Sequence, residues 1–571
     1  MGKHAAVQVL ESIASILELK GDNPFKVRAF SNAAHALEAY PGELSQALAS
    51  GELAGLKGIG RATLDVVSEV VRTGQSSALA ALQQEVPAGL VEMLRISGLG
   101  ATKIRALHQQ LGIATVAELE AAARDGRLAD LPRFGDKTAQ KILRGIEFLR
   151  RTSAFRLSHH AARTAEQLRR AVQPIGGVER AEVAGSVRRR AEVVRDVDLV
   201  VACRGAAPDL RAWLGAAAAA ADVPAAAGSV SFRLEDDTPA DVYFTPPERF
   251  GHALLWATGS PKHLERLAAH AAARGYRLDR DGLWRDDGAV PCPDEQALYA
   301  ALGLAWIPPE LREGGDEVAR AAAGTLPRLV EREDLAGALH CHSVYSDGTN
   351  TVAELAGACR AAGYRYLGIS DHSQAAAYAG GLSEEDVARQ HQEIDALNRD
   401  GGGFRILKGI EADILADGAL DYGPRVLDRF DFVIGSIHSR MEMDEATMTR
   451  RVLQAMDDPH LTILGHPTGR LLLSRDPFRI DVHAVIARAA ERGVAIEING
   501  DPHRLDLDWR LCAEARDAGV ALGIGSDAHS LAGLEHAELG VAVARKGWLE
   551  RGDILNTRDA DGFLAYARAR R

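Results

Sequence analysis

The stretch "GSVRRRAEVVRDVDLVV" (residues 185–201) places Asp196 and Asp198 inside a run that otherwise has the composition of a buried β-strand. Side chains alternate between the two faces of a strand, so both carboxylates project from one face while Val197 and Leu199 project from the other. Burying two adjacent carboxylates is costly unless a cation lies between them. The stretch therefore predicts a strand whose acidic pair binds a cationic partner.

A third carboxylate, Asp241, lies in another β-prone run, "PADVYFT" (239–245). Three carboxylates on neighbouring strands form an oxygen-rich site that suits hard divalent cations such as Mg²⁺. Two such ions are the usual requirement of an in-line phosphoryl displacement. The alternative is that the aspartates make solvated salt bridges with Arg189 or Arg195.

The bulk composition describes a large globular chain. It has 571 residues, of which 46% are hydrophobic and 26% charged, so several domains are expected. We find no signal-peptide pattern and no apolar run near the roughly 20 residues that span a bilayer. The five cysteines are scattered and odd in number, which favours a reducing compartment. We therefore expect a cytoplasmic protein without membrane contact.

The formal net charge of −12 is unevenly distributed. Residues 1–150 hold 17 basic and 16 acidic side chains, and residues 151–330 hold 23 and 24. The acidic excess therefore belongs to residues 331–571. The overall sign of the charge does not argue against nucleic-acid binding by the first half.

The pattern of secondary structure changes along the chain. Residues 1–150 predict helices broken by glycine turns, and residues 151–250 predict short strands around an alanine-rich helix at 213–228. A smaller α/β unit follows, and the Gly/Pro-punctuated segment 308–334 predicts a linker, either flexible or docked. Beyond it, short strands alternate with helices, which predicts a parallel α/β barrel with its chemistry at the C-terminal ends of the strands.

Three segments near the N-terminus share a glycine turn that leads into a helix: "LAGLKGIGRATLDVV" (53–67), "LRISGLGATKIRAL" (94–107) and "LPRFGDKTAQKIL" (131–143). Each resembles a helix-hairpin-helix motif, although one copy alone could be an ordinary helical hairpin. Glycines permit positive φ and expose backbone amides, which can hold a DNA phosphate without reading bases. The candidate DNA-binding residues are Gly58, Gly60, Gly98, Gly100, Lys103, Gly135 and Lys137.

Imidazoles and carboxylates follow the predicted strands of the last third. An isolated histidine is usually a core or surface residue, but two pairs here have i, i+2 spacing and the others fall at the ends of further strands. Nine such groups at one barrel mouth are best explained by a cluster of two or three metal ions, and mixed N/O ligation suits Mn²⁺ or Zn²⁺. The candidate ligands are His340, His342, Asp347, His372, Glu411, His438, His466, Asp527 and His529.

Residues 1–315 resemble the family X DNA polymerases of the polymerase beta type. The resemblance is carried by the Gly185-Ser186 spacing to the aspartate pair, by Asp241 and by "WATGS" (256–260). It implies that Asp196, Asp198 and Asp241 are catalytic and hold two Mg²⁺ or Mn²⁺, with Asp241 helping to activate the primer 3′-hydroxyl. It also implies nucleotide contacts by Ser186, Arg189, Trp256 and Gly259.

Two positions depart from that family. An aromatic pair usually precedes "TGS", whereas Trp256-Ala257 stands here, so discrimination between sugars is not predicted. The family's lyase lysine aligns with Val66, and the surrounding helix offers no lysine. A Schiff base needs an amine, so we expect no lyase activity by that route.

Residues 335–571 resemble the PHP (polymerase and histidinol phosphatase) domain, with all nine ligand positions filled. The expected fold is multidomain α+β and α/β, ending in a distorted (β/α)7 barrel. The expected domains are a helical lyase-like domain (1–80), a fingers-type domain (81–150), a nucleotidyltransferase palm (151–250), a thumb-type domain (251–315), a linker (316–335) and a PHP domain (336–571).

The expected function is gap filling in DNA repair, including base excision repair, combined with metal-dependent 3′–5′ exonuclease activity. The partners are gapped or nicked DNA and deoxynucleoside triphosphates, and we expect a monomer. Two alternatives are a DNA-binding scaffold with vestigial sites and a nucleotidyltransferase fused to a histidinol-phosphate-type phosphatase. The intact ligand sets argue against the first, and the hairpins argue against the second.

Overall fold

The computed structural model describes residues 3–571 apart from 41, 43, 97, 133, 205–227, 235–237, 287 and 401. The alanine-rich helix expected at 213–228 lies outside the described residues except for Gly228. The chain forms two compact units. One comprises residues 1–154 with 473–475, the other comprises 155–472 with 476–571, and each is described separately.

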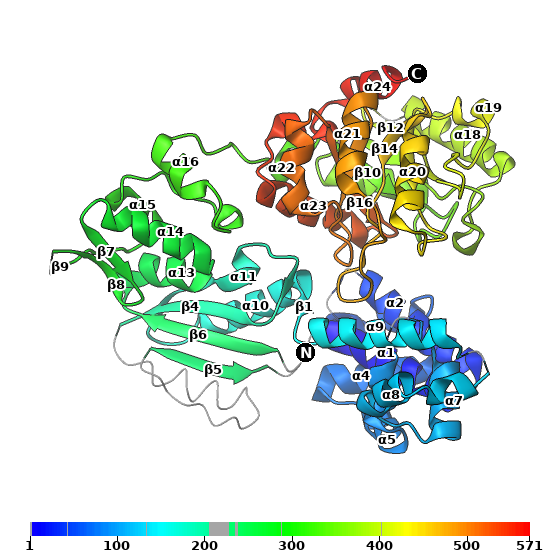
Figure 1. Ribbon diagram of the computed structural model, residues 1–571, viewed down its shortest axis with the longest axis horizontal. Helices are drawn as coiled ribbons and strands as arrows, with labels where there is room; N and C mark the ends of the chain where they lie inside the picture. The colour runs from blue at the N-terminus through cyan, green and yellow to red at the C-terminus, as the bar shows by residue number, and fades with distance from the viewer. Residues whose placement is uncertain are drawn as a thin grey trace. The chain divides into compact units, whose positions relative to one another are not determined.

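The first unit is helical (Figure 1). Its helices bury residues at helical spacing: in α4, Val66, Val67 and Val70 lie on one face and are buried. The N-terminal helices share one apolar core, and the later helices share a second. The elements are α1 (Lys3–Lys20), α2 (Pro24–Ala39), α3 (Leu44–Ser50), η1 (Glu52–Gly55), α4 (Arg61–Thr73), α5 (Ser77–Glu85), α6 (Ala88–Met93), α7 (Ala101–Leu111), α8 (Val116–Arg124), η2 (Arg127–Asp130) and α9 (Asp136–Thr152).

The three predicted hairpins each end in a regular second helix that begins directly after a glycine: α4 after Gly60, α7 after Gly100 and α9 after Gly135. The first helix is α-helical only in the middle motif, where it is α6. In the other two it is a single 3₁₀ turn, η1 or η2, which follows a glycine in the left-handed conformation. The predicted glycine turn and second helix are therefore present in all three motifs, and the first helix is short in two of them.

The second unit begins with a four-stranded sheet of order β2-β4-β6-β5 (Figure 1). Valine-rich strands such as "VDLVVAC" suit this position, because β4 and β6 are central. Helix α10 packs on β2 and β4, and α11 packs on β4. The elements are β1 (Arg156–Leu157), α10 (Ser158–Val172), β2 (Val178–Val183), α11 (Gly185–Arg188), β3 (Val193–Val194), β4 (Val197–Cys203), β5 (Ser229–Arg233) and β6 (Pro239–Thr245).

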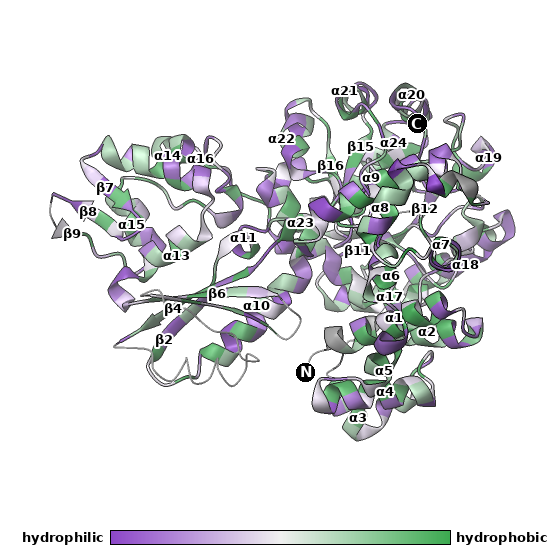
Figure 2. Cartoon of the chain, turned by 60° about the horizontal axis from the view of Figure 1, so that its bottom comes forward, coloured by the Kyte–Doolittle hydropathy of each residue, from purple (hydrophilic) through white to green (hydrophobic). Residues whose placement is uncertain are grey.

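A smaller α/β part follows, with an antiparallel sheet β7-β8-β9. Helix α14 is amphipathic, and hydrophobic and hydrophilic residues alternate along it in Figure 2. The elements are η3 (Pro247–Arg249), α13 (Phe250–Thr258), α14 (Pro261–Ala272), β7 (Tyr276–Asp279), β8 (Gly282–Arg285), β9 (Gly288–Ala289), α15 (Glu295–Ala301), η4 (Pro309–Leu311) and α16 (Glu317–Ala323).

The segment 308–334 is docked rather than extended. Arg312 and Glu317 have no exposed surface, and α16 packs on α14. Glu317 Oε1 lies 2.8 Å from His263 Nδ1 on α14. A buried hydrogen bond of this kind holds the segment against the preceding part.

Seven parallel strands, β10 to β16, form a closed barrel in sequence order. The expected barrel is confirmed. Its strands and 3₁₀ lead-in are η5 (Arg332–Asp334), β10 (Gly337–Cys341), β11 (Tyr366–Ile369), β12 (Arg405–Asp413), β13 (Phe432–Ser436), β14 (Leu461–Leu464), β15 (Ala495–Asn499) and β16 (Leu522–Ala528). The helical elements are α17 (Val352–Ala361), η6 (Ala377–Ala379), α18 (Glu384–Asp400), α19 (Pro424–Leu427), α20 (Glu445–Met456), α21 (Val482–Arg492), α22 (Trp509–Asp517), η7 (Ala532–His536), α23 (Ala537–Lys546), η8 (Arg551–Asp553), η9 (Leu555–Thr557) and α24 (Ala560–Arg568).

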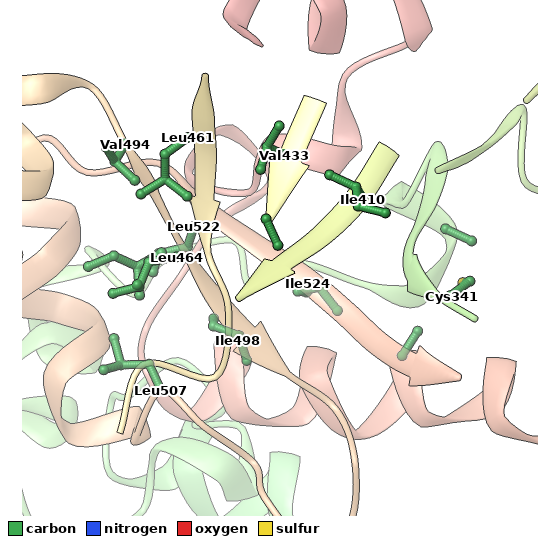
Figure 3. Packing of buried hydrophobic residues seen from close by; sticks show 14 of the residues in the cluster. Cys341, Ile410, Val433, Leu461, Leu464, Val494, Ile498, Leu507, Leu522 and Ile524 are labelled. Atoms are coloured by element: carbon green, nitrogen blue, oxygen red, sulfur yellow. The ribbon is translucent and has the colours of Figure 1, made fainter. Parts of the chain in front are cut away.

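Side chains along the barrel strands point alternately to two opposite faces, which differ in composition. One set of side chains, including Val433, Ile410 and Ile498, joins the core cluster between strands and helices (Figure 3). The opposite set begins with apolar residues such as Phe432 and Ile434, which belong to a second cluster. Further along the same strand faces come polar residues such as Glu411 on β12, so the C-terminal end of the barrel is available for ligation.

None of the helices in the part of the chain that the structure describes is long and apolar enough to cross a membrane.

Two candidate metal centres

Of the three predicted catalytic aspartates, Asp198 and Asp241 lie on the two central strands of the four-stranded sheet and Asp196 lies next to them. Strands β4 and β6 are parallel, and Asp198 is directly opposite Asp241 in their register. Asp196 immediately precedes β4, which starts at Val197 rather than including both aspartates as predicted. Asp196 and Asp198 are half-buried. The sheet therefore brings the three carboxylates together from sequence positions more than 40 residues apart.

Mutual repulsion is evident in the pKa of these carboxyls. Burial, and then the charges of Asp196 and Asp241, raises the pKa of Asp198 to about 7. Burial and the charge of Asp241 also raise the pKa of Asp196. The cations that could relieve this repulsion are engaged elsewhere, since Arg189 pairs with Glu313 and Arg195 lies over the Phe155 ring. The salt-bridge alternative is thus not what the structure contains.

A cavity of about 650 Å³ opens beside the aspartates. Asp196 and Asp198 line it together with all four predicted nucleotide contacts: Ser186, Arg189, Trp256 and Gly259. The volume is in the range of small-molecule sites. The cavity thus places acidic groups for cations next to a hydroxyl and a guanidinium suited to phosphate oxygens.

Gly185 is required where the chain enters this cavity. Its φ is +63°, and a Cβ there would lie 1.8 Å from Asp198 Oδ2. Only glycine allows both the left-handed conformation and this close approach. The glycine of the quoted "GS" pair therefore lets the turn pack against the acidic strand.

A buried ion network around this cavity escaped the sequence analysis. Glu295 accepts hydrogen bonds from Arg188 and Arg312, with Nη1–Oε1 distances of 2.7 and 2.6 Å. Burial opposes ionisation, but the two arginines lower the pKa of Glu295. Arg188 Nη1 also donates to Thr258 Oγ1 at 2.9 Å. The network ties α11 to the smaller α/β part, and no local pattern in the sequence indicated these partners.

All nine predicted barrel ligands converge. They fall into four overlapping groups whose ligand atoms lie within 4.8 Å of one another. The groups are His342-Asp347-His372-His529, His340-His466-Asp527, His340-His342-Glu411 and His372-Glu411-His438.

Glu411 is central to this cluster. Its Oε1 lies 3.3 Å from His340 Nε2, 3.3 Å from His438 Nε2 and 3.0 Å from His466 Nε2. Its Oε2 lies 2.8 Å from His372 Nδ1 and 3.9 Å from His342 Nε2. Although burial opposes it, this set of imidazoles holds the pKa of Glu411 well below its usual range.

The donor set fits metal ions. Several of these atoms are buried without a hydrogen-bond partner, among them His340 Nε2, both ring nitrogens of His342 and Glu411 Oε2. Native proteins seldom leave such groups unpaired, and a bound ion is a common reason for such a cluster. Imidazole and carboxylate donors suit Zn²⁺ and Mn²⁺, while Cys341 belongs to the outer apolar cluster and takes no part.

Three further residues support these ligands and were not predicted. Glu497 Oε1 lies 2.5 Å from His340 Nδ1, and Asp413 Oδ1 lies 2.7 Å from His438 Nδ1. Carboxylates in this position fix the orientation of a ligating imidazole. Arg504 Nε lies 3.3 Å from Asp527 Oδ2. A single Glu within the apolar run "VAIEING" was the available signal for Glu497.

The histidines of the barrel cluster have different pKa values because their surroundings differ. Although burial opposes both shifts, Glu411 and Asp413 raise the pKa of His438 to about 10, and Asp347 and Asp527 raise that of His529 to about 9. Burial, reinforced by His529, lowers the pKa of His342 to about 3. His342 is therefore a neutral imidazole with one ring nitrogen able to donate its lone pair, as a metal ligand must be.

The hairpin residues lie where a phosphate-binding turn needs them. Gly58 and Gly98 have φ of +100° and +81°, which an L side chain would strain. Gly60, Gly100 and Gly135 precede the first turns of α4, α7 and α9, whose free amides attract anions.

The two lysines at these turns differ in exposure and hydrogen bonding. Lys137 is exposed, whereas Lys103 Nζ donates back to Gly98 O at 3.0 Å. Val66 is buried on α4, at the position where the resemblance expects a lysine. These turns therefore present backbone amides and exposed amines such as that of Lys137, and α4 carries no lysine.

A sheet with a carboxylate triad beside a cavity of small-molecule size, followed by a histidine-rich seven-stranded barrel, defines a nucleotidyltransferase joined to a metal-dependent phosphoesterase domain. A family model described as DNA polymerase beta thumb matches residues 253–313, and a PHP domain model matches 338–500. Models of a helix-hairpin-helix domain and of a SAM-like helix-hairpin-helix tandem match residues 1–76 and 90–147.

Relatives cover both the whole chain and the barrel alone. The DNA polymerase/3′-5′ exonuclease PolX of Bacillus subtilis (strain 168) is 38% identical over 579 residues, 99% of each chain. A probable phosphatase of Shewanella sp. (strain MR-4) is 29% identical over 211 residues, 35% of this chain and 79% of that relative. The chain belongs to the family X DNA polymerases that carry a PHP domain.

Proposed function

We propose that this chain fills short gaps in DNA during repair, including base excision repair, and removes nucleotides from 3′ ends at a second site. Its substrates are gapped or nicked DNA and deoxynucleoside triphosphates, and it acts as a monomer. Five free cysteines support a cytoplasmic location. The domain boundaries at residues 80, 150, 250, 315 and 335 remain predictions.

In the polymerase site, Asp196, Asp198 and Asp241 would hold two Mg²⁺ or Mn²⁺. Ions bound there activate an attacking oxygen and offset charge on the leaving phosphate. Asp241 would help to activate the primer 3′-hydroxyl, and its carboxylate accepts a hydrogen bond from Ser231. Oriented carboxylates of this kind fix where the cations and the primer end meet.

The cavity residues would bind the incoming nucleotide. Ser186 and Arg189 contact the triphosphate, Gly259 lies beside the sugar and Trp256 forms part of the wall. Ala257 offers only a methyl group at the position where an aromatic ring is usual in the family. Selection against a ribose hydroxyl would then depend on the backbone at Gly259.

In the barrel, the nine clustered groups would hold two or three Mn²⁺ or Zn²⁺. Ions bound there supply a nucleophile at neutral pH and stabilise charge on the phosphodiester. Glu497 and Asp413 orient His340 and His438, and Arg504 sets the position of Asp527. The substrate is the terminal phosphodiester of a 3′ end.

The hairpins would grip DNA through its backbone, including a 5′-phosphate at a gap. Gly58, Gly60, Gly98, Gly100 and Gly135 supply turn amides, while Lys103 and Lys137 add charge. Lyase activity through a lysine on α4 is not expected, since Val66 holds that position.

The observation that carries the proposal is the paired register of Asp198 and Asp241 beside the cavity that Ser186 and Arg189 line. A one-nucleotide-gapped duplex, incubated with and without dNTPs in Mg²⁺ or Mn²⁺, tests it. Asp198→Ala should abolish extension and keep 3′ removal, while His342→Ala should do the reverse. Parent-like behaviour of both variants would refute the site assignments, and barrel activity confined to small phosphomonoesters would favour the phosphatase alternative.

A further inference from the structure

The segment after α11 is held by the barrel. Lys546, the last residue of α23, donates from Nζ to the backbone oxygen of Arg189 at 3.1 Å. Arg510 Nη1 lies 3.2 Å from Glu192 Oε1, so a second barrel residue fastens the same segment three residues later. The segment that presents Arg189 to the nucleotide cavity is therefore positioned by side chains of the barrel.

Lys546 also makes an unusual charge contact. Its side chain is 2% exposed, and its Nζ pairs with Glu313 Oε1. The same oxygen accepts a hydrogen bond from Arg189 Nε at 3.1 Å. One carboxylate thus lies between the predicted triphosphate-binding guanidinium and a buried ammonium group. The ammonium also lies 4.7 Å over the Trp509 ring, which favours a cation there.

Two nitrogens of the Arg189 side chain are engaged in this structure. Besides the contact of Nε with Glu313, Nη1 donates to the backbone oxygen of Thr258, the residue before Gly259. Turning the guanidinium toward a triphosphate gives up the contact with Glu313, and a partly buried carboxylate without a counter-ion is costly. Lys546 makes its own contact with the same Glu313 oxygen, so the barrel supplies a charge for that carboxylate when Arg189 turns away.

We propose that Lys546 of the barrel is a positioning residue of the polymerase site, which neutralises Glu313 and so frees Arg189 for the incoming triphosphate. The proposal rests on the proposed role of Arg189 as a nucleotide contact. It makes part of the nucleotide affinity of the polymerase site a property of the PHP barrel. This effect of Lys546 on nucleotide affinity does not involve the metal cluster of the barrel.

The test is the steady-state kinetics of gap filling by the full chain. Lys546→Met should raise the KM for dNTP roughly tenfold, the size of one lost charged hydrogen bond, with little change in kcat. The matched control is Arg545→Met, since Arg545 lies in the same helix and bonds Glu310 at 2.7 Å without touching Glu313. Removal of 3′ nucleotides should be unchanged in both variants.

A second substitution that restores KM distinguishes this role of Lys546 from a general effect on the fold. Adding Glu313→Gln to Lys546→Met removes the unpaired carboxylate and should return KM to the parent value. Glu313→Gln alone should lower KM, because Arg189 loses the carboxylate that competes with the triphosphate for it. This variant tests the proposal even where the protein does not fold with a substitution at Lys546. A KM in Lys546→Met no higher than in Arg545→Met, or no rescue by Glu313→Gln, would overturn the proposal.

Arg189→Ala distinguishes the two levels of inference. If it leaves KM unchanged, the proposed nucleotide contact is wrong. If it raises KM while Lys546→Met does not, the contact stands and the role of Lys546 fails.

Discussion

The two candidate metal centres differ in charge composition. The sheet presents three carboxylates, whereas the barrel presents six imidazoles and three carboxylates. Without cations, the sheet groups can only repel one another, which is why the pKa of Asp198 rises to about 7. The barrel groups partly neutralise one another, and the pKa of Glu411 falls. A site of like charges depends on its ions for relief, while a mixed site retains internal pairing when they leave.

The largest expected effect is on activity. Asp198→Asn keeps the size of the side chain but removes a charge, and should slow extension roughly a thousandfold through lost charge stabilisation. His342→Ala should slow 3′ removal by a similar factor. Single-turnover rates on a gapped duplex measure both. Loss of both activities in either variant would contradict two independent centres.

The second expected effect is on stability without metal, and its sign differs between the sites. In chelator, Glu411→Gln should lower the free energy of unfolding by about 3 kcal/mol, since it leaves buried imidazoles without their anion. Asp198→Asn should raise it by about 1 kcal/mol, because one of three repelling charges is gone. Urea denaturation of the full chain measures both. The same sign in both variants would refute the contrast.

The candidate ligands of both centres are easier to find in the sequence than the residues that support them. Asp196, Asp198 and Asp241 stand out as charges inside apolar runs, and the barrel histidines fall at the ends of strands. The i, i+2 spacing of His340 and His342 predicted that they lie close together, and they do, although the strand has an irregularity there and His340 has a φ of +56°.

The residues that support the two centres could not be predicted, because their partners come from distant parts of the chain. Arg188 meets Glu295 across 107 residues, and Lys546 meets Glu313 across 233. A lone charged residue in a helix is indistinguishable from a solvated one until the fold places its partner. The docked segment 308–334 was ambiguous for the same reason, since its Gly/Pro composition does not reveal that Arg312 and Glu317 are buried.

A smaller effect is expected from the partners of the ligands. Glu497→Gln should weaken Mn²⁺ binding in the barrel roughly 10–100-fold, because His340 loses the carboxylate that orients it. Extension by the polymerase site should be unchanged. Equilibrium dialysis against Mn²⁺, with His342→Ala as reference, measures the affinity. An unchanged affinity would mean that Glu497 is not needed to orient His340.

The smallest effect is that of pH on metal loading. A pKa of about 7 means that the ion-free carboxyl of Asp198 keeps its proton up to that pH. Because this folded-state pKa is raised, protonation gives the ion-free protein a stability contribution that is full below the ordinary pKa of an aspartate and is lost as the pH rises through about 7. The half-saturating Mg²⁺ concentration for extension should therefore rise about tenfold for each pH unit below 7 and level off above it.

The barrel should respond at higher pH, since the pKa of His529 is about 9. Its loading with Mn²⁺, followed by 3′ removal, should keep improving from pH 7 to pH 8, where the Mg²⁺ requirement for extension is already constant. The two profiles are measured on one preparation of the full chain. Coincident profiles would mean that a shared step, such as DNA binding, sets both, and the difference in charge composition would then have no consequence for metal loading.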